Sequence, residues 1–90
     1  MIIGNALLVY KQQLLCILDN YSGMEQVEQQ VVQDFQISYS CNARPDDVRQ
    51  ALETLHGDGL AEKRRDTLRG WVWKINREGH AAAAKIELEN

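Results

Sequence analysis

Apolar residues recur near the start of the chain at the three- and four-residue spacing of a helix. The stripe in residues 5–21 consists of Leu7, Tyr10, Leu14, Ile17, Leu18 and Tyr21, and it is widened by Leu8 and Leu15. This period predicts a helix that is apolar over about half of its circumference. A face this wide fits a helix packed between others, and it equally fits a helix that also contacts a second copy of the chain.

The helical spacing resumes after a break at residues 20–23. Residues 24–35 repeat it, and residues 36–43 are predicted to form an extended or looped link. A third helix is predicted over residues 45–56, because Pro45 suits the first helical position and Gly57 commonly follows a helix end. The apolar stripe of this third helix is Val48, Ala51, Leu52 and Leu55.

The remainder of the chain predicts a β-hairpin followed by a helix. Residues 60–65 and 71–75 are strand-like, and residues 66–70 between them are suited to a turn. Trp71, Trp73 and Ile75 share one face at the two-residue period of a strand, which favours core packing over base stacking. The alanine-rich residues 81–86 favour a last helix. The predicted order is therefore α-α-α-β-β-α, mainly helical with a small hairpin.

Two stretches of sequence carry a resemblance to a known family. They are Val48-Arg49-Gln50-Ala51-Leu52-Glu53-Thr54-Leu55 with Gly59-Leu60-Ala61-Glu62-Lys63 after it, and Ile75-Asn76-Arg77-Glu78-Gly79. Over about residues 5–84 the chain resembles winged helix-turn-helix DNA-binding domains, and in length and pattern it is similar to small winged-helix proteins of Mu-like phages and prophages. The resemblance implies a transcriptional regulator or a phage-type accessory protein whose third helix meets the major groove of DNA and whose hairpin, the wing, holds the backbone.

The chain departs from the family pattern in its third helix. Arg44 stands where the family usually has a serine or threonine cap, and the outward face is acidic through Asp46, Asp47 and Glu53. On this helix the residues expected to contact DNA are Arg44, Arg49, Gln50 and Thr54.

The charge distribution points to the wing. The net charge is −3, but residues 63–77 alone carry a charge of +5. Because phosphate neutralisation supplies most non-specific DNA affinity, this basic segment is the expected backbone contact. Its predicted DNA-binding residues are Lys63, Arg64, Arg65, Arg69 and Lys74. Two alternatives stay open: charges that only protect an exposed strand edge, and a protein-protein adaptor, which the acidic third helix favours.

The remaining features exclude other classes of function. The 90 residues suit one domain, with a core over about residues 5–86 and a short acidic tail at 87–90. The chain has no apolar run long enough to span a membrane, and its two distant cysteines suit a reducing cytoplasm. No metal-ligand spacing and no nucleophile with a histidine partner is present, so we expect neither an enzyme nor a cofactor. The candidate dimer contacts are Leu8, Leu15, Ala82, Ala83 and Ile86.

Overall fold

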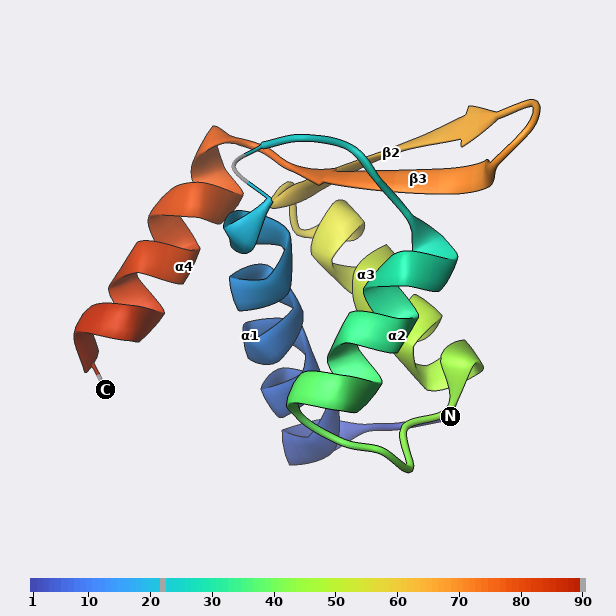
Figure 1. Cartoon of the computed structure of the whole chain (residues 1–90). Coiled ribbons are helices and arrows are strands. Elements are labelled where there is room, and N and C mark those ends of the chain that lie inside the picture. The colour runs from blue at the N-terminus through green and yellow to red at the C-terminus, as the bar shows by residue number, and fades with distance from the viewer. Residues whose placement is uncertain (22, 90) are drawn as a thin grey trace.

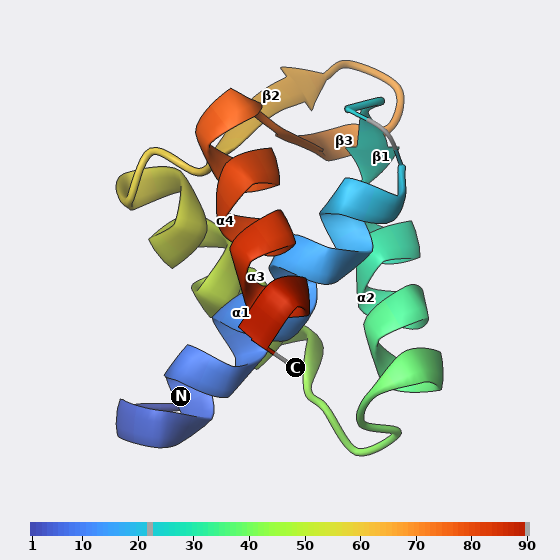
Figure 2. The same cartoon turned by 90° about the vertical axis from the view of Figure 1, so that its left-hand side faces the viewer.

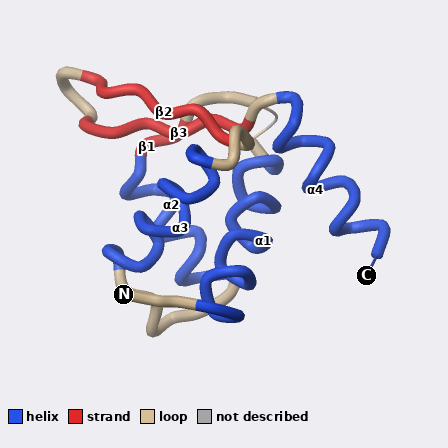
Figure 3. Tube along the Cα trace, turned by 180° about the vertical axis from the view of Figure 1, so that it is seen from behind, coloured by secondary structure: helices blue, strands red, loops and turns tan. Residues whose placement is uncertain are grey.

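The computed structural model describes residues 1–21 and 23–89 of the chain. Its helices are α1 (Gly4–Asn20), α2 (Glu28–Ser38), α3 (Pro45–Gly57) and α4 (Arg77–Glu89). Its strands are β1 (Gln26–Val27), β2 (Ala61–Asp66) and β3 (Gly70–Ile75), which form an antiparallel sheet in the order β1-β3-β2. The sheet lies across one end of α1, α2 and α3, and the β2–β3 hairpin projects beyond them (Figures 1 and 3). The three predicted helices, the hairpin and the last helix are thus all present.

The core lies where the apolar faces of the helices meet the sheet. Leu14 and Leu18 of α1 are fully buried, and α1 packs against α2, α3, α4 and β3. The Tyr10 ring of α1 lies 4.7 Å from the ring of Phe35 on α2, measured between centroids. Trp73 closes the core from the sheet and is 0 % exposed, which confirms its prediction as a core residue. The position between other elements thus buries part of the apolar face of α1, namely Leu14, Leu15 and Leu18, while Leu8 is 50 % exposed.

The second helix differs from its prediction at both ends. Residues 24–27 were expected to be helical, but Gln26 and Val27 form β1 and pair with Trp73 and Val72 of β3. Helix α2 starts only at Glu28 and continues to residue 38, through part of the expected link. The reason is physical: a two-residue strand is too short to show a period, and its hydrogen-bond partners lie far along the chain (Figure 2 shows β1 beside β3).

Helix α3 begins and ends close to its predicted limits. Pro45 takes the first helical position, and Arg44 before it is extended and makes no side-chain cap hydrogen bond. The acidic first turn with Asp46 and Asp47 suits the positive end of the helix dipole. After α3 the chain turns at Gly59, whose φ of 79° lies in the left-handed region that glycine adopts without strain. This turn leads directly into the wing.

The start of α4 is tied to the start of the wing by the second family-like stretch. The Asn76 side chain accepts a hydrogen bond from the Gly79 N–H at 2.8 Å, which caps the helix, and donates one to the Gly59 carbonyl at 2.7 Å. Gly79 packs so closely that a Cβ there would lie 2.1 Å from the Leu60 carbonyl oxygen. The residues Asn76 and Gly79 therefore hold α4 against the strand that enters the wing.

Two of the expected dimer contacts, Leu15 and Ala83, are buried within the chain. Leu15 is 4 % exposed and Ala83 is 0 % exposed, because α1 and α4 of one chain pack against each other. These side chains have no surface left for a second copy, so that part of the expectation is wrong. Leu8 remains half exposed, and Ala82 and Ile86 are partly buried against the core.

Candidate nucleic-acid interface

The strand register divides the basic residues of the wing between two faces. Lys63 pairs with Trp73 and Arg65 pairs with Trp71, so these side chains share the face that packs toward α3. Arg64 pairs with Val72 on the opposite face of the hairpin. The +5 segment is therefore not one continuous patch.

On the face toward α3, three cations surround the Trp71 ring. The Lys63 ammonium lies 5.0 Å from the ring centroid, and the guanidinium carbons of Arg49 and Arg65 lie 5.7 and 5.5 Å from it. Each such contact contributes about 0.5–1 kcal/mol where the ring stays partly wet. Because Arg49 belongs to α3 and Arg65 to β2, the cluster brings cations from both predicted DNA-binding elements to one side of the molecule. We call Arg49, Lys63, Arg65 and Trp71 the cation cluster.

Arg49 is positioned by contacts that sequence reasoning did not find. Its Nε lies 3.9 Å from a carboxylate oxygen of Glu28, the first residue of α2. The same carboxylate accepts a hydrogen bond of 2.9 Å from the indole N–H of Trp73. A buried tryptophan therefore orients the carboxylate, and the carboxylate steers a guanidinium that is 43 % exposed. No local pattern signals this pairing, because Glu28 and Trp73 are far apart in sequence.

Several wing cations are paired with carboxylates. Lys63 Nζ lies 2.8 Å from both carboxylate oxygens of Glu53 on α3. Arg64 makes two hydrogen bonds of 2.8 Å to Glu25, and these hold the pKa of Glu25 below its ordinary value. In the folded chain, two acids from outside the basic segment thus lie against the wing. They reduce the net positive charge that the sequence suggests for this segment.

At the tip of the hairpin, Asp66 organises the turn. Its carboxylate accepts the backbone N–H groups of Leu68 and Arg69 at 2.9 and 3.0 Å, and these hydrogen bonds lower the pKa of Asp66. The Arg69 guanidinium also lies 3.3 Å from this carboxylate. Arg69 is therefore partly committed to shaping the turn.

Other predicted contacts keep their charge unpaired within the described part of the chain. Arg44 at the start of α3, Arg65 on β2 and Lys74 on β3 have no carboxylate partner among the residues described. Arg44 and Arg65 are exposed. These two guanidiniums are thus exposed and without a carboxylate partner among the described residues.

The outward face of α3 is a shallow groove of about 490 Å³. Its walls are Asp46, Arg49, Gln50, Glu53 and Thr54. The Thr54 hydroxyl donates to the Gln50 carbonyl at 2.9 Å, so it is occupied within the helix. The Gln50 amide is hydrogen-bonded to the backbone of Ile2, and the Met1 amino group lies 3.1 Å from Asp47. Of the four residues predicted to contact DNA here, Gln50 and Thr54 are thus hydrogen-bonded within the chain. Arg44 is exposed, and the Arg49 side chain is 43 % exposed.

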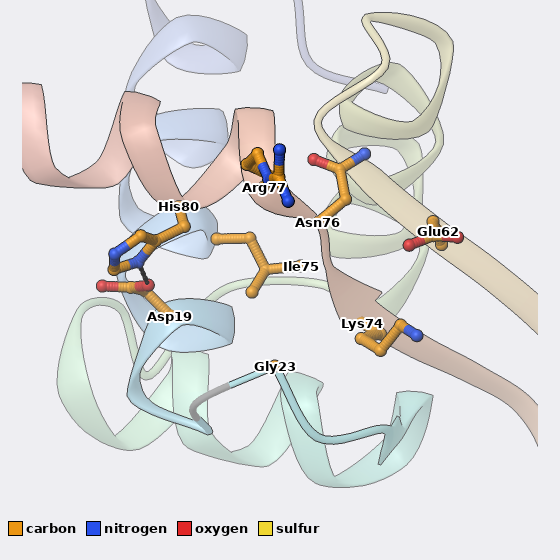
Figure 4. Close-up of a pocket in the computed structure, with 8 residues that line it drawn as sticks. All are labelled: Asp19, Gly23, Glu62, Lys74, Ile75, Asn76, Arg77 and His80. Carbon is orange, nitrogen blue, oxygen red and sulfur yellow. Dashed lines mark hydrogen bonds and ion pairs between the residues drawn. The ribbon is translucent and has the colours of Figure 1, made fainter.

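A second cleft of about 730 Å³ lies between the end of α1, the sheet and the start of α4 (Figure 4). Lys74 lines it with Glu62, Arg77, His80 and others, so Lys74 belongs to a different surface from the cation cluster. His80 Nδ1 lies 2.5 Å from Asp19 Oδ1, and this carboxylate raises the pKa of His80 above its ordinary value.

Among residues 1–21 and 23–89, no group of three or more histidine, cysteine or acidic side chains is placed to hold a metal ion. In the same described residues, none of the helices is long and apolar enough to cross a membrane.

Together, three helices, an antiparallel sheet with a projecting hairpin and a following helix define the winged helix-turn-helix fold. The solved structure of a mutant of Lactococcus lactis ZitR is similar, with a TM-score of 0.68 and 16 % sequence identity. The match covers 89 % of this chain and 50 % of that one, so this chain spans about half the length of the ZitR chain. No protein-family model matches the sequence, and no curated protein matches it significantly. The comparison confirms the fold class predicted from the sequence.

Proposed function

We propose that this chain binds double-stranded DNA as a small winged-helix regulator or phage-type accessory protein. Helix α3 would approach the major groove while the wing contacts the backbone. The observation that carries this proposal is the cation cluster, in which Arg49 of α3 and Arg65 of β2 flank the same Trp71 ring. A guanidinium from the helix and one from the wing on one side of the molecule match the two-point contact of such a domain with a duplex.

We expect the cations to contribute unequally to DNA binding, because some are held in ion pairs and others are not. Arg44 and Arg65 are exposed and lack a described carboxylate partner, so they can neutralise phosphates without breaking an ion pair. Arg64 would first have to leave Glu25, and Lys63 would have to leave Glu53. We therefore expect the first pair to contribute more to DNA affinity than the second.

The decisive experiment measures duplex binding by fluorescence anisotropy over a series of salt concentrations. Arg65→Glu should weaken binding and lower the slope of log K against log salt by about 0.9 for each phosphate that the protein no longer neutralises. The matched control is Lys85→Glu on α4, which makes the same change in net charge at an exposed position outside α3 and the wing. A triple reversal of Arg64, Arg65 and Arg69 would be less informative, because it also strips Glu25 and Asp66 of their partners.

Two results would refute the DNA proposal. One is a wild-type protein that leaves duplex unbound at about 50 mM salt, where phosphate contacts are strong. The other is an equal loss of affinity in Arg65→Glu and Lys85→Glu, which would trace binding to net charge alone.

A second candidate function is an adaptor that binds another protein. It is favoured by the carboxylates of Asp46 and Glu53 that line the groove of α3 beside Arg49, and by the ion pairs that neutralise part of the wing. An adaptor would leave duplex unbound at low salt while a pull-down recovers a specific protein that Asp46→Arg releases. Duplex binding that weakens in Arg65→Glu more than in Lys85→Glu would count against the adaptor.

We also propose that the chain forms a homodimer through the exposed part of α1. Leu8 is 50 % exposed, and Ala82 and Ile86 offer further apolar surface on α4. A dimer would present two wings to one duplex and would make the spacing of DNA half-sites meaningful.

A further inference from the structure

The segment that precedes α1 lies against the outward side of α3. The backbone is extended at Ile3, with φ −142° and ψ 167°, and the N-terminus lies near the start of α3 (Figure 1). The Gln50 side-chain amide donates to the Ile2 carbonyl at 2.7 Å, and the Ile2 N–H donates to the Gln50 side-chain carbonyl oxygen at 3.0 Å. Both ends of one side-chain amide are thus used by the backbone of a single residue.

Gln50 lines the groove on the outward face of α3, the surface that would enter the major groove of DNA. A glutamine amide recognises adenine by the same arrangement, with its N–H₂ donating to N7 and its carbonyl oxygen accepting from the N6 amino group. The Ile2 backbone therefore occupies the two groups that a base edge would need. A bidentate pair with a base uses the same edge of the amide as the bidentate pair with Ile2, so the two pairings exclude each other.

The segment is held in a way that permits release. The Met1 amino group also lies 3.1 Å from Asp47, but the side chains on either side of Ile2 are largely in solvent, since Met1 is 96 % exposed and Ile3 is 76 % exposed. The two hydrogen bonds are only partly buried, so water can replace them at a modest net cost. The segment therefore covers Gln50 without being part of the core.

We propose that residues 1–3 form a strap that covers the base-reading side of α3 in the free protein and leaves it when DNA binds. This inference rests on the proposed DNA-binding function. The strap lowers the affinity for every duplex, because Gln50 must leave its Ile2 partner before it meets a base.

The test uses two variants at the same position. Ile2→Pro removes the N–H that donates to Gln50, because proline has no backbone donor, whereas Ile2→Ala keeps it. We expect Ile2→Pro to bind duplex about threefold to tenfold more tightly than the wild type, because the net contribution of a hydrogen bond that water can replace is of this size. Ile2→Ala should bind as the wild type does. In the free protein, the Gln50 side-chain amide signals in an NMR spectrum should move in Ile2→Pro and stay in Ile2→Ala.

Gln50→Ala tests the other partner of these two hydrogen bonds. It also releases the strap, but it removes the amide that would pair with adenine. This variant should therefore no longer distinguish a duplex with adenine at the contacted position from one with another base there. If wild type and Ile2→Pro bind duplex equally, the strap is refuted while DNA binding stands. If neither binds duplex, the proposed function and the strap both fail.

Discussion

Gly79 is the position at which the packing of α4 on the wing can be tested most directly. It lies in the first turn of α4, where its N–H donates to the Asn76 side chain at 2.8 Å. A Cβ at this position would lie 2.1 Å from the Leu60 carbonyl oxygen and 2.6 Å from Cγ1 of Ile75. The first of these neighbours is backbone and cannot rotate away, so Gly79→Ala must push α4 off the sheet.

The magnitude follows from this geometry. Forcing an extra methyl into a packed site costs about 1–3 kcal/mol, and the higher helix propensity of alanine offsets at most about 1 kcal/mol. We expect Gly79→Ala to lower the free energy of unfolding by about 2 kcal/mol, out of a total of about 5–13 kcal/mol for a chain of this length. At this size the destabilisation corresponds to a fall in Tm of about 8–16 °C.

Urea denaturation followed by tryptophan fluorescence measures the effect, because Trp73 is fully buried in the folded chain. The control is Gly57→Ala at the end of α3, where a Cβ would meet nothing within 4 Å. That substitution should be neutral or stabilising by up to about 1 kcal/mol. The reasoning is refuted if the free energy of unfolding of Gly79→Ala lies within about 0.5 kcal/mol of the wild-type value, since Gly79 could not then lie so close to Leu60.

Three further predictions concern the His80 ion pair, the Trp73 indole and the dimer. The pKa of His80 should exceed the ordinary histidine value in an NMR titration and fall in Asp19→Asn; an unchanged pKa in that variant would contradict the ion pair. The stability that the pair contributes is present at low pH and is lost as the pH rises through the raised pKa of His80. Glu28→Ala leaves the indole N–H of buried Trp73 without its acceptor and should cost about 1–3 kcal/mol in a denaturant titration, while Glu28→Gln keeps an acceptor and should cost less; equal costs would refute the role of this hydrogen bond. Light scattering after size-exclusion chromatography should give twice the mass of the chain, and Leu8→Glu should give the monomer mass; a monomeric wild type at high concentration would remove the dimer proposal.

Only part of the candidate site could be predicted from the sequence. The basic residues of the wing and the outward residues of α3 were found because charge runs and helical spacing are local properties. Their ion-pair partners were not found: Glu25 reaches Arg64 from the loop before β1, and Glu53 reaches Lys63 from α3. The +5 of the wing segment was therefore an overestimate of the charge that the surface presents.

The dimer prediction failed in part for a related reason. Leu15 and Ala83 belong to apolar faces, and a sequence pattern shows that such residues are buried without showing what buries them. In the structure they pack within one chain, between α1 and α4. Burial could be predicted at both positions, but the partner could not.

The sequence by itself determined the order of the four helices and the hairpin, the approximate limits of α1 and α3, and hence the winged-helix fold, because each follows from a period repeated over several neighbouring residues. The tertiary structure alone decided the strand β1, the carboxylates on the wing, the carboxylate that orients Arg49 and the contact of Ile2 with Gln50. These pairings join residues that are distant in sequence, so they exist only after packing brings the backbones together. The wing is thus defined by local sequence, whereas its charge and the accessibility of α3 are set by contacts across the fold.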